Sequence, residues 1–325
     1  MRVPDLFKGK TARNLIALTA RPMIRLLYGL QKRTLTVIVF HEVLDHPTGF
    51  VKERDLTVSA AAFRRQILWV NEHFNIIHPD ALQGEKKLPP RAALITFDDG
   101  FAGAFENGIS FLLENRIPSL MFLNMKSVTE QTPLISVVAN FLENFDPAFL
   151  AFAKEINLPQ PFHLTLNPKV LAMYEHKNGP VDIKKILAYQ GPIIDNEAIQ
   201  KYNGEKLLVF GNHLYEHWNA RALSTEEFVE QYQKNKEVLT QFSNAGNFFA
   251  FTNGQPDSCF SNTEIQVLQG MGAPAIFSSS NSVNLNLDAA VIDRISFRET
   301  DDDAILWLRI AKGLKKSLFN KKGLV

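Results

Sequence analysis

Short apolar runs and amphipathic helical patterns alternate along most of the chain. The apolar runs are bounded by turn residues, as buried parallel strands are, and cover residues 36–40, 92–97, 119–124, 207–210, 248–251, 273–277 and 291–296. The helical patterns, with apolar residues three or four positions apart, cover residues 60–74, 111–115, 225–242 and 262–270. This alternation predicts parallel βα units that close into a barrel-like α/β domain.

Residues 126–205 break the alternation. They contain helical patterns at 134–144, 147–156, 169–176 and 183–189 but no convincing strand. A long insertion between two barrel strands commonly covers the mouth of a site, so we expect a helical cap here. The chain then divides into a barrel over residues 34–305, which contains the insertion, and two flanking segments, 1–33 and 306–325.

Both flanking segments are basic. Residues 1–33 hold eight Lys or Arg and one acid, residues 306–325 hold six and none, and the total charge of +1 leaves the body near −12. Because the folded body is acidic, we expect no nucleic-acid partner. Each end mixes cationic and apolar residues as a basic amphipathic helix does. Such a helix either packs on the domain or lies on an anionic membrane surface, and the sequence leaves both open.

The composition narrows the class of protein further. Hydrophobic residues make up 46% and charged residues 21%, which is typical of a soluble globular protein and excludes disorder or coiled coil for the whole. The single cysteine, Cys259, excludes an internal disulfide and a cysteine-based zinc site. No apolar run approaches the ~20 residues that span a bilayer, and charges interrupt every candidate signal core. We therefore expect a cytoplasmic protein, peripheral at the inner face of the membrane if the basic ends dock there.

The strongest chemical signal is the sequence Thr-Phe-Asp-Asp-Gly at 96–100, directly after the apolar run 92–97. Two adjacent carboxylates at the end of a buried strand are costly unless they are paired, protonated or bound to a cation. Active sites of α/β barrels lie at this end of the strands. Successive strand residues point to opposite sides, so one aspartate can bind a metal while the other remains a free base.

Two further segments also follow predicted strands. His213 and His217 are four positions apart, and on a helical turn this spacing places both imidazoles on one face, where they can bind one ion. Together with an aspartate they form a His₂Asp set that suits Zn²⁺ and a water. The run 248–254 ends in a turn at Asn253 and Gly254, whose backbone N–H groups can face an oxyanion.

Taken together, these segments resemble the polysaccharide deacetylase family, the NodB-homology enzymes similar to carbohydrate esterase family 4. The Thr-Phe-Asp-Asp-Gly sequence matches its first motif, His213 and His217 match its His-x₃-His motif, and Phe-Ala-Phe-Thr-Asn-Gly approximates its third. The resemblance covers about residues 35–125 and 205–297. It implies a NodB-type distorted (β/α)₇ barrel with the helical insertion between the first and second motifs.

The resemblance also implies roles for four of these residues. Asp98 is expected to be the general base, and Asp99, His213 and His217 the metal ligands. The metal is expected to be Zn²⁺, with Co²⁺ or Mn²⁺ as alternatives. The other five histidines outside these motifs and the first strand, including His163, have no matching partners, and we expect them to be structural.

Three more residues complete the expected site. The Asn253 N–H is expected to stabilise the oxyanion. No histidine follows His217, so the late Leu-x-His motif that supplies the general acid in many members is absent. A subgroup with permuted motifs uses a histidine at the end of the first strand, and His41 occupies that place. Arg294 is expected to steer the Asp98 carboxylate, with an ordinary salt bridge as the alternative.

The leading functional prediction is a metal-dependent hydrolase that removes an N-acyl group, expected to be acetyl, from an amino sugar of a glycan or a glycolipid. The basic ends favour a lipid-linked sugar as substrate. The alternative is a catalytically silent glycan-binding homologue, suggested by Leu214 and Thr252, which depart from the family motifs, and by the missing late histidine. A hydrolase acting on a small non-sugar amide is a third possibility.

Overall fold

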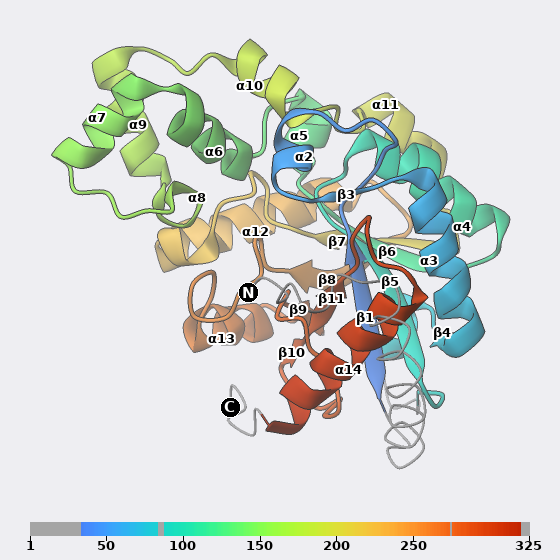
Figure 1. Cartoon of the computed structure of the whole chain (residues 1–325). Helices are drawn as coiled ribbons and strands as arrows, with labels where there is room; N and C mark the ends of the chain where they lie inside the picture. The colour runs from blue at the N-terminus through green and yellow to red at the C-terminus, as the bar shows by residue number, and fades with distance from the viewer. Residues whose placement is uncertain (1–33, 84–87, 274, 320–325) are drawn as a thin grey trace, which may run out of the picture.

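A parallel sheet, nearly closed into a barrel, forms the centre of the molecule (Figure 1). The computed structural model describes residues 34–83, 88–273 and 275–319. Within them the sheet has the order β10-β9-β8-β7-β6-β5-β1-β11, with β4 also paired to β5. The strands are β1 (Leu35–Phe40), β4 (Asn75–Ile76), β5 (Ala92–Phe97), β6 (Ser119–Leu123), β7 (Leu208–Asn212), β8 (Ala245–Ala250), β9 (Ala275–Phe277), β10 (Val291–Ile292) and β11 (Arg294–Ser296).

One continuous segment joins the two edges of this sheet. In β10, Val291 pairs with β9, and three residues later Arg294 of β11 pairs with Val37 of β1. Asp293 lies between the two strands, where Asn284 accepts a hydrogen bond from its N–H at 2.7 Å and donates one to its carbonyl at 2.8 Å. If β10 and β11 are counted as one bent strand, the barrel has seven strands around it. The predicted distorted (β/α)₇ barrel is therefore confirmed.

Alternate side chains of each strand pack on the two sides of the barrel wall. In β5, Ala92 and Leu94 belong to the inner cluster with Phe122 and Phe277. Their neighbours in the sequence, such as Ile95, belong to the larger outer cluster under the helices. Both faces of the strands are therefore buried, which is why the strands read as continuous apolar runs.

Three of the helices around the barrel begin at serine caps. Ser59 accepts a hydrogen bond from the Ala62 N–H, and Ser224 and Ser261 each form a capping box with a glutamate three residues later. The elements are α2 (Gly49–Glu53), α3 (Ala60–His73), α4 (Ser110–Glu114), α12 (Thr225–Leu239), α13 (Asn262–Gly270), α14 (Asp303–Phe319), and the short strands β2 (Glu42–Val43) and β3 (Thr57–Val58). A π-helical turn, residues Ala104–Ile109, precedes α4 and was not expected from the sequence.

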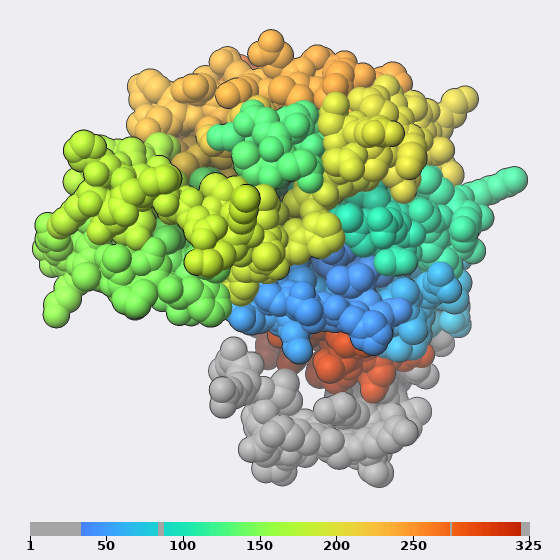
Figure 2. Space-filling view, turned by 90° about the horizontal axis from the view of Figure 1, so that it is seen from above, coloured from blue at the N-terminus to red at the C-terminus, as the bar shows by residue number. Residues whose placement is uncertain are grey.

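The insertion between β6 and β7 is helical, and the described residues contain no strand there. Its elements are α5 (Met125–Glu130), α6 (Ile135–Phe145), α7 (Pro147–Glu155), α8 (Phe162–Thr165), α9 (Pro168–Asn178), α10 (Ile183–Gln190) and α11 (Asn196–Ile199). Figure 2 shows it, in green and yellow-green, as a lobe at one side of the molecule.

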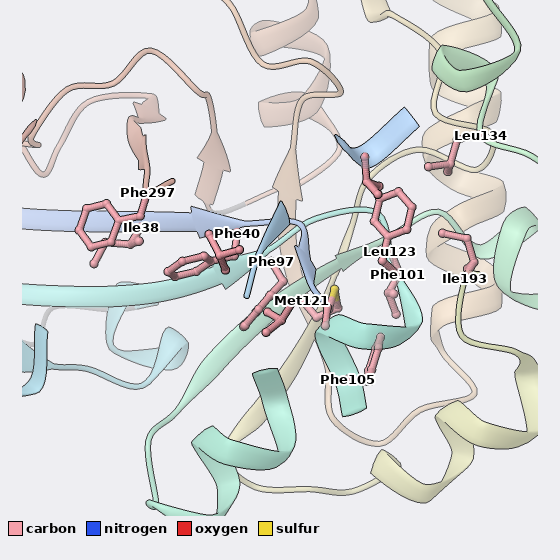
Figure 3. Packing of buried hydrophobic residues seen from close by; sticks show 14 of the residues in the cluster. Ile38, Phe40, Phe97, Phe101, Phe105, Met121, Leu123, Leu134, Ile193 and Phe297 are labelled. Carbon is pink, nitrogen blue, oxygen red and sulfur yellow. The ribbon is translucent and has the colours of Figure 1, made fainter. Parts of the chain in front are cut away.

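Backbone hydrogen bonds join the insertion to the loops of the barrel that follow β5 and β7. The Ile194 N–H donates to the Gly100 carbonyl at 3.0 Å, and the Ile135 N–H donates to the Glu216 carbonyl at 3.1 Å. Leu134 belongs to the same apolar cluster as Leu123 of β6 (Figure 3). The insertion therefore shares the main core instead of being tethered only by its two ends.

The described part of the C-terminal segment packs on the barrel. In α14, Leu306, Trp307, Ile310 and Leu314 are buried, and the Trp307 ring lies edge-on to Trp69 of α3 with centroids 5.0 Å apart. This is the packed alternative for that helix, whose first turn begins before residue 306. The N-terminal segment 1–33 lies outside the described residues. Among the described residues, no helix combines the length and the hydropathy that crossing a bilayer requires.

Candidate metal centre and active site

The two aspartates of the first motif lie at the carboxyl end of β5, where the chain leaves the sheet in a left-handed turn. Asp99 has φ 74° and Gly100 has φ 85°. A Cβ at Gly100 would lie 2.9 Å from Leu123, so both the conformation and the space favour glycine there. The turn sends the two buried carboxylates to different partners.

Asp99 faces both histidines of the second motif. Its Oδ1 lies 3.1 Å from Nε2 of His217 and 3.5 Å from Nε2 of His213. One ligand atom from each of the three residues lies within 4.8 Å of the others. Tetrahedral Zn²⁺ with bonds of about 2.0–2.1 Å places its ligand atoms roughly 3.3 Å apart. Oδ1 is buried and accepts no hydrogen bond from the described residues, so this arrangement fits a divalent cation.

The histidine loop is not the helical turn expected from its spacing. Leu214 and His217 have φ 62° and 65°, so the chain turns back on itself between the two histidines. The imidazole rings still converge, with centroids 5.0 Å apart and planes at 70°. The expectation of a helical turn was wrong because i, i+4 spacing brings side chains together in a compact loop as well as in a helix.

Neighbouring amides and a carbonyl hold this loop in place. Nδ1 of His213 lies 2.8 Å from the Ala250 carbonyl, which can only accept, so Nδ1 carries a hydrogen, and in the neutral imidazole Nε2 then has the lone pair that can bind a cation. Asn124 Nδ2 donates to the carbonyls of His213 and Leu214, the latter at 2.9 Å. Asn212 Oδ1 accepts from the Leu214 N–H at 2.9 Å. The loop is therefore ordered although Leu214 carries no hydroxyl.

Asp98 pairs with a buried arginine. Arg294 is fully buried and donates through Nη1 to Oδ1 at 2.6 Å and through Nη2 to Oδ2 at 2.8 Å. Burial alone would raise the pKa of Asp98, but the charge of Arg294, with smaller effects from His213 and His41, holds that pKa below its ordinary value. Asp98 is therefore ionised and held in one orientation beside the three candidate ligand atoms, since its Oδ2 lies 4.0 Å from Nε2 of His213.

His41 follows β1 and lies near the same carboxylate oxygen of Asp98 as His213 does. Its Nε2 is 3.9 Å from Asp98 Oδ2, and its side chain is 22% exposed. Burial is the main cause that lowers the pKa of His41 below its ordinary value, opposed by the two nearby aspartates. The ring lines the same cavity as the two aspartates and the two histidines of the motifs.

The third motif forms the turn expected after β8. Asn253 and Gly254 have φ 58° and 66°, and Asn253 Nδ2 is buried without a hydrogen-bond partner among the described residues. Thr252 donates its hydroxyl to the Trp218 carbonyl, which ties this turn to the histidine loop. The residue that departs from the family motif thus has a structural role.

Apart from the fully buried Arg294 and Thr252, the motif side chains and His41 face one cavity of about 510 Å³, to which the insertion contributes a wall. Ser136 and Asn140 of α6 and His163 of α8 line it, and the sequence analysis had assigned none of them to the site. The segment after α2 adds Arg54, whose charge is among the causes, after burial, that lower the pKa of His163 to about 4. No motif or spacing marks these residues, because the topology alone brings them to the cavity.

Comparison with known families decides the classification. The model of the polysaccharide deacetylase family matches residues 85–276, which is more than half of the chain. The chain belongs to the polysaccharide deacetylase family. Membership confirms the expected resemblance and indicates a deacetylase of the hydrolase class. His41 and Arg294 lie outside the matched residues, and the structure brings both of them beside Asp98, as the sequence analysis expected.

Solved structures share the fold at low identity. IcaB from Ammonifex degensii is 18% identical, with a TM-score of 0.55 over 86% of this chain and 97% of that one. A de-N-acetylase from Aggregatibacter actinomycetemcomitans is 14% identical, with a TM-score of 0.56 over 85% and 100% of the two chains. The Streptococcus pyogenes deacetylase PplD is 11% identical, with a TM-score of 0.53 over 85% and 98%. A comparison with curated sequences finds no significant match.

Proposed function

We propose that this member of the family is a metal-dependent N-deacetylase that acts on an amino sugar of a glycan or of a lipid-linked glycan. The observation that carries the proposal is the convergence of Asp99, His213 and His217 on one point, with an ionised carboxylate, Asp98, beside it. All four side chains face the same cavity. The names of the structural neighbours, which include a de-N-acetylase, support an acetamido group as the target.

A divalent cation, Zn²⁺ in the first instance and Co²⁺ or Mn²⁺ as alternatives, fits these three ligands and would supply Lewis acidity to the acyl carbonyl. The residues of the chain perform the proton transfers. Asp98 accepts a proton from the attacking water, and Arg294 keeps its carboxylate ionised and aimed. The backbone N–H of Asn253 donates to the oxyanion as the C–O bond forms.

His41 completes the reaction as the general acid. The C–N bond breaks only if the amine leaves as a neutral group, so a proton must reach the nitrogen. His41 is an imidazole beside Asp98 that is not one of the three proposed ligands, and it also faces the cavity. Because burial lowers the pKa of His41, the ring begins neutral, takes up the proton that Asp98 has accepted from the water, and passes it to the amine nitrogen. The products are then acetate and the free amino sugar.

The silent glycan-binding alternative is less well supported by the geometry. The two substitutions that suggested it leave every ligand in place, since Asn124 and Asn212 hold the loop at Leu214 and Thr252 ties two motif loops together. Loss of function usually begins with a ligand or the base, and here both are present.

Acetate release tests the proposal. Purified protein is stripped with a chelator, reloaded with Zn²⁺, Co²⁺ or Mn²⁺, and incubated with N-acetylglucosamine pentamers. Asp98→Asn should lose acetate release but retain bound metal, which is measured by inductively coupled plasma mass spectrometry. Asp99→Ala should lose both. Equal acetate release by wild type and Asp98→Asn would reject the mechanism.

The basic N-terminal segment, residues 1–33, supports a peripheral position on an anionic membrane, which would suit a lipid-linked substrate on the cytoplasmic side. Deletion of residues 1–30 should abolish binding to anionic phospholipid vesicles without loss of metal. Unchanged vesicle binding by the truncated protein would reject this part of the proposal.

A further inference from the structure

A second hollow lies on the insertion, outside the catalytic cavity. It has a volume of about 520 Å³ and lies between α6 and α10, which pack against each other. Three aromatic residues form its floor: Phe141, Phe145 and Tyr189. We call this feature the aromatic groove.

The three rings of the aromatic groove pack against one another at the surface. Ring centroids are 5.1 Å apart for Phe141 and Phe145, 5.2 Å for Phe145 and Tyr189, and 5.7 Å for Phe141 and Tyr189. The Phe145 side chain is nevertheless 53% exposed. Phe141 and Tyr189 are half-buried, so the groove presents the exposed ring of Phe145 backed by two further aromatic rings, an arrangement that can receive the apolar face of a ligand.

Tyr189 connects the aromatic groove to the catalytic cavity. Its hydroxyl lies 2.6 Å from Asn140 Oδ1 and also contacts the Glu53 carboxylate. Its ring packs edge-on against Phe50, with centroids 6.1 Å apart. Asn140, Glu53 and Phe50 all line the catalytic cavity, so Tyr189 is part of the wall between the two hollows. In Figure 1, α2, the helix that contains Phe50 and Glu53, lies beside α10.

The charged residues that line the aromatic groove indicate which class of ligand it can bind. Lys185 pairs with Asp182 at 3.1 Å, and Asp146 caps α7 by accepting the Ala148 N–H at 3.0 Å. The three charged residues that line the groove therefore sum to −1 and offer no free cation. The lining therefore offers no unpaired cation to attract a phosphate-rich ligand or an anionic lipid surface, whereas the apolar C–H face of a neutral sugar ring fits an aromatic floor.

We infer that the aromatic groove binds sugar units of the substrate chain beyond the unit whose acetyl group is removed. This inference rests on the proposed function and deepens it, because it makes the preferred substrate an oligosaccharide or polysaccharide. One sugar unit occupies the catalytic cavity, the chain leaves past Glu53 and Asn140, and a later unit stacks on Phe145. The groove contributes binding energy that a single N-acetylglucosamine cannot gain.

Binding and kinetics with Phe145→Ala test the inference. Met173→Ala is the matched control, because Met173 is another exposed apolar residue of the insertion, 44% exposed on α9, and does not line the groove. The probes are β-1,4 and β-1,6 linked N-acetylglucosamine pentamers and the monosaccharide. Calorimetry with Asp98→Asn, alone and combined with each variant, measures binding, and acetate release by proteins with Asp98 intact measures KM and kcat.

We expect Phe145→Ala to weaken pentamer binding and to raise the pentamer KM by about five- to tenfold, with kcat and monosaccharide activity unchanged. Met173→Ala should change neither. Equal pentamer affinity with and without Phe145→Ala overturns the inference, as does failure of both pentamers to bind. Phe145-dependent dimerisation or vesicle binding, with pentamer binding unaffected, also overturns it.

The two proposals fail in different ways. If no acetate is released from any sugar but pentamer binding still depends on Phe145, the proposal that the aromatic groove binds sugar is supported and the proposed deacetylation is rejected. If acetate release from pentamer and monosaccharide is equally efficient and insensitive to Phe145→Ala, the deacetylation stands and the aromatic groove falls.

Discussion

Arg294 holds both oxygens of the Asp98 carboxylate, at 2.6 and 2.8 Å, although the two residues are 196 positions apart in the chain. The arginine is itself held, because its Nε donates to the Ser278 carbonyl at 2.8 Å and its guanidinium lies 5.3 Å from the centre of the Phe122 ring. This pair is formed where β11 closes the barrel against β1. The strand pairing that closes the barrel therefore also orients the proposed base.

Arg294→Met should lower kcat without loss of metal, because Asp98 would lose both its orientation and the charge that lowers its pKa. Removing one partner of a buried ion pair costs about 3–5 kcal/mol, so the free energy of unfolding should fall by that order. Urea denaturation and acetate release measure the two effects.

A double-mutant cycle with Asp98→Asn separates orientation from general damage. The double variant should lose less stability than the sum of the two single variants, because no unpaired charge remains buried. Additive losses would show that the two side chains are not coupled, and Arg294 would then have no positioning role.

His41→Gln should reduce amide hydrolysis by about 10²–10⁴-fold while sparing an activated ester. An amine needs a proton to leave, whereas the nitrophenolate of 4-nitrophenyl acetate does not. Acetate release from an N-acetylglucosamine pentamer and nitrophenolate absorbance measure the two reactions. Asp98→Asn is the contrast, since loss of the base should slow both. Equal losses on amide and ester in His41→Gln would remove His41 from the role of general acid.

Asn124→Ala should weaken metal binding by about 10–100-fold, although Asn124 is not one of the proposed ligands. Its amide orients the histidine loop through the carbonyls of His213 and Leu214. Competition with a fluorescent zinc chelator measures the affinity. Asn115→Ala is the matched control, because Asn115 donates to the Phe111 carbonyl at 2.8 Å at an exposed position away from the site. Unchanged affinity in Asn124→Ala would show that the loop is ordered without it.

Glu42 should make the protein less stable as the pH rises towards neutrality. Burial raises the pKa of Glu42 to about 7 from its ordinary 4.5. The folded state therefore binds the proton more tightly than the unfolded state, and the stability present below about pH 4.5 is lost as the pH approaches 7. Relative to wild type, Glu42→Gln should gain on the order of 3 kcal/mol at pH 8 and little at pH 4.5.

Urea denaturation of the Glu42→Gln variant at both pH values checks this prediction. Glutamine keeps an oxygen that can accept the Val43 N–H, which Glu42 accepts at 2.8 Å. Glu114→Gln, at an exposed position on α4, controls for the loss of a surface carboxylate. A stability difference that does not change with pH would contradict a protonation effect at Glu42.

The barrel was predictable because its signals are local. A strand buried on both faces reads as an apolar run whatever its partners are, and the predicted run 92–97 is β5 to the residue. The aspartates at 98–99 and the histidines at 213 and 217 were visible because each motif is a few consecutive residues. The insertion was visible because it interrupts a regular pattern.

The loop conformation, the cavity wall and the aromatic groove were not predictable in the same way. The left-handed backbone at Leu214 and His217 depends on Asn124 and Ala250, which are distant in sequence. His163 has no motif around it and reaches the cavity only because α8 is tied to the histidine loop, where Asn219 donates to the Leu164 carbonyl at 2.6 Å.

The amino-acid sequence by itself determined the order of strands and helices, the family motifs and the residue types that can bind a cation. The sequence already suggested Arg294 as a partner of Asp98, but only the tertiary structure decided that it holds both carboxylate oxygens and that Tyr189 joins two hollows. The physical reason is that apolar periodicity and short motifs involve only residues that are close together in the sequence. A contact between distant side chains exists only after the barrel closes and the insertion packs against it.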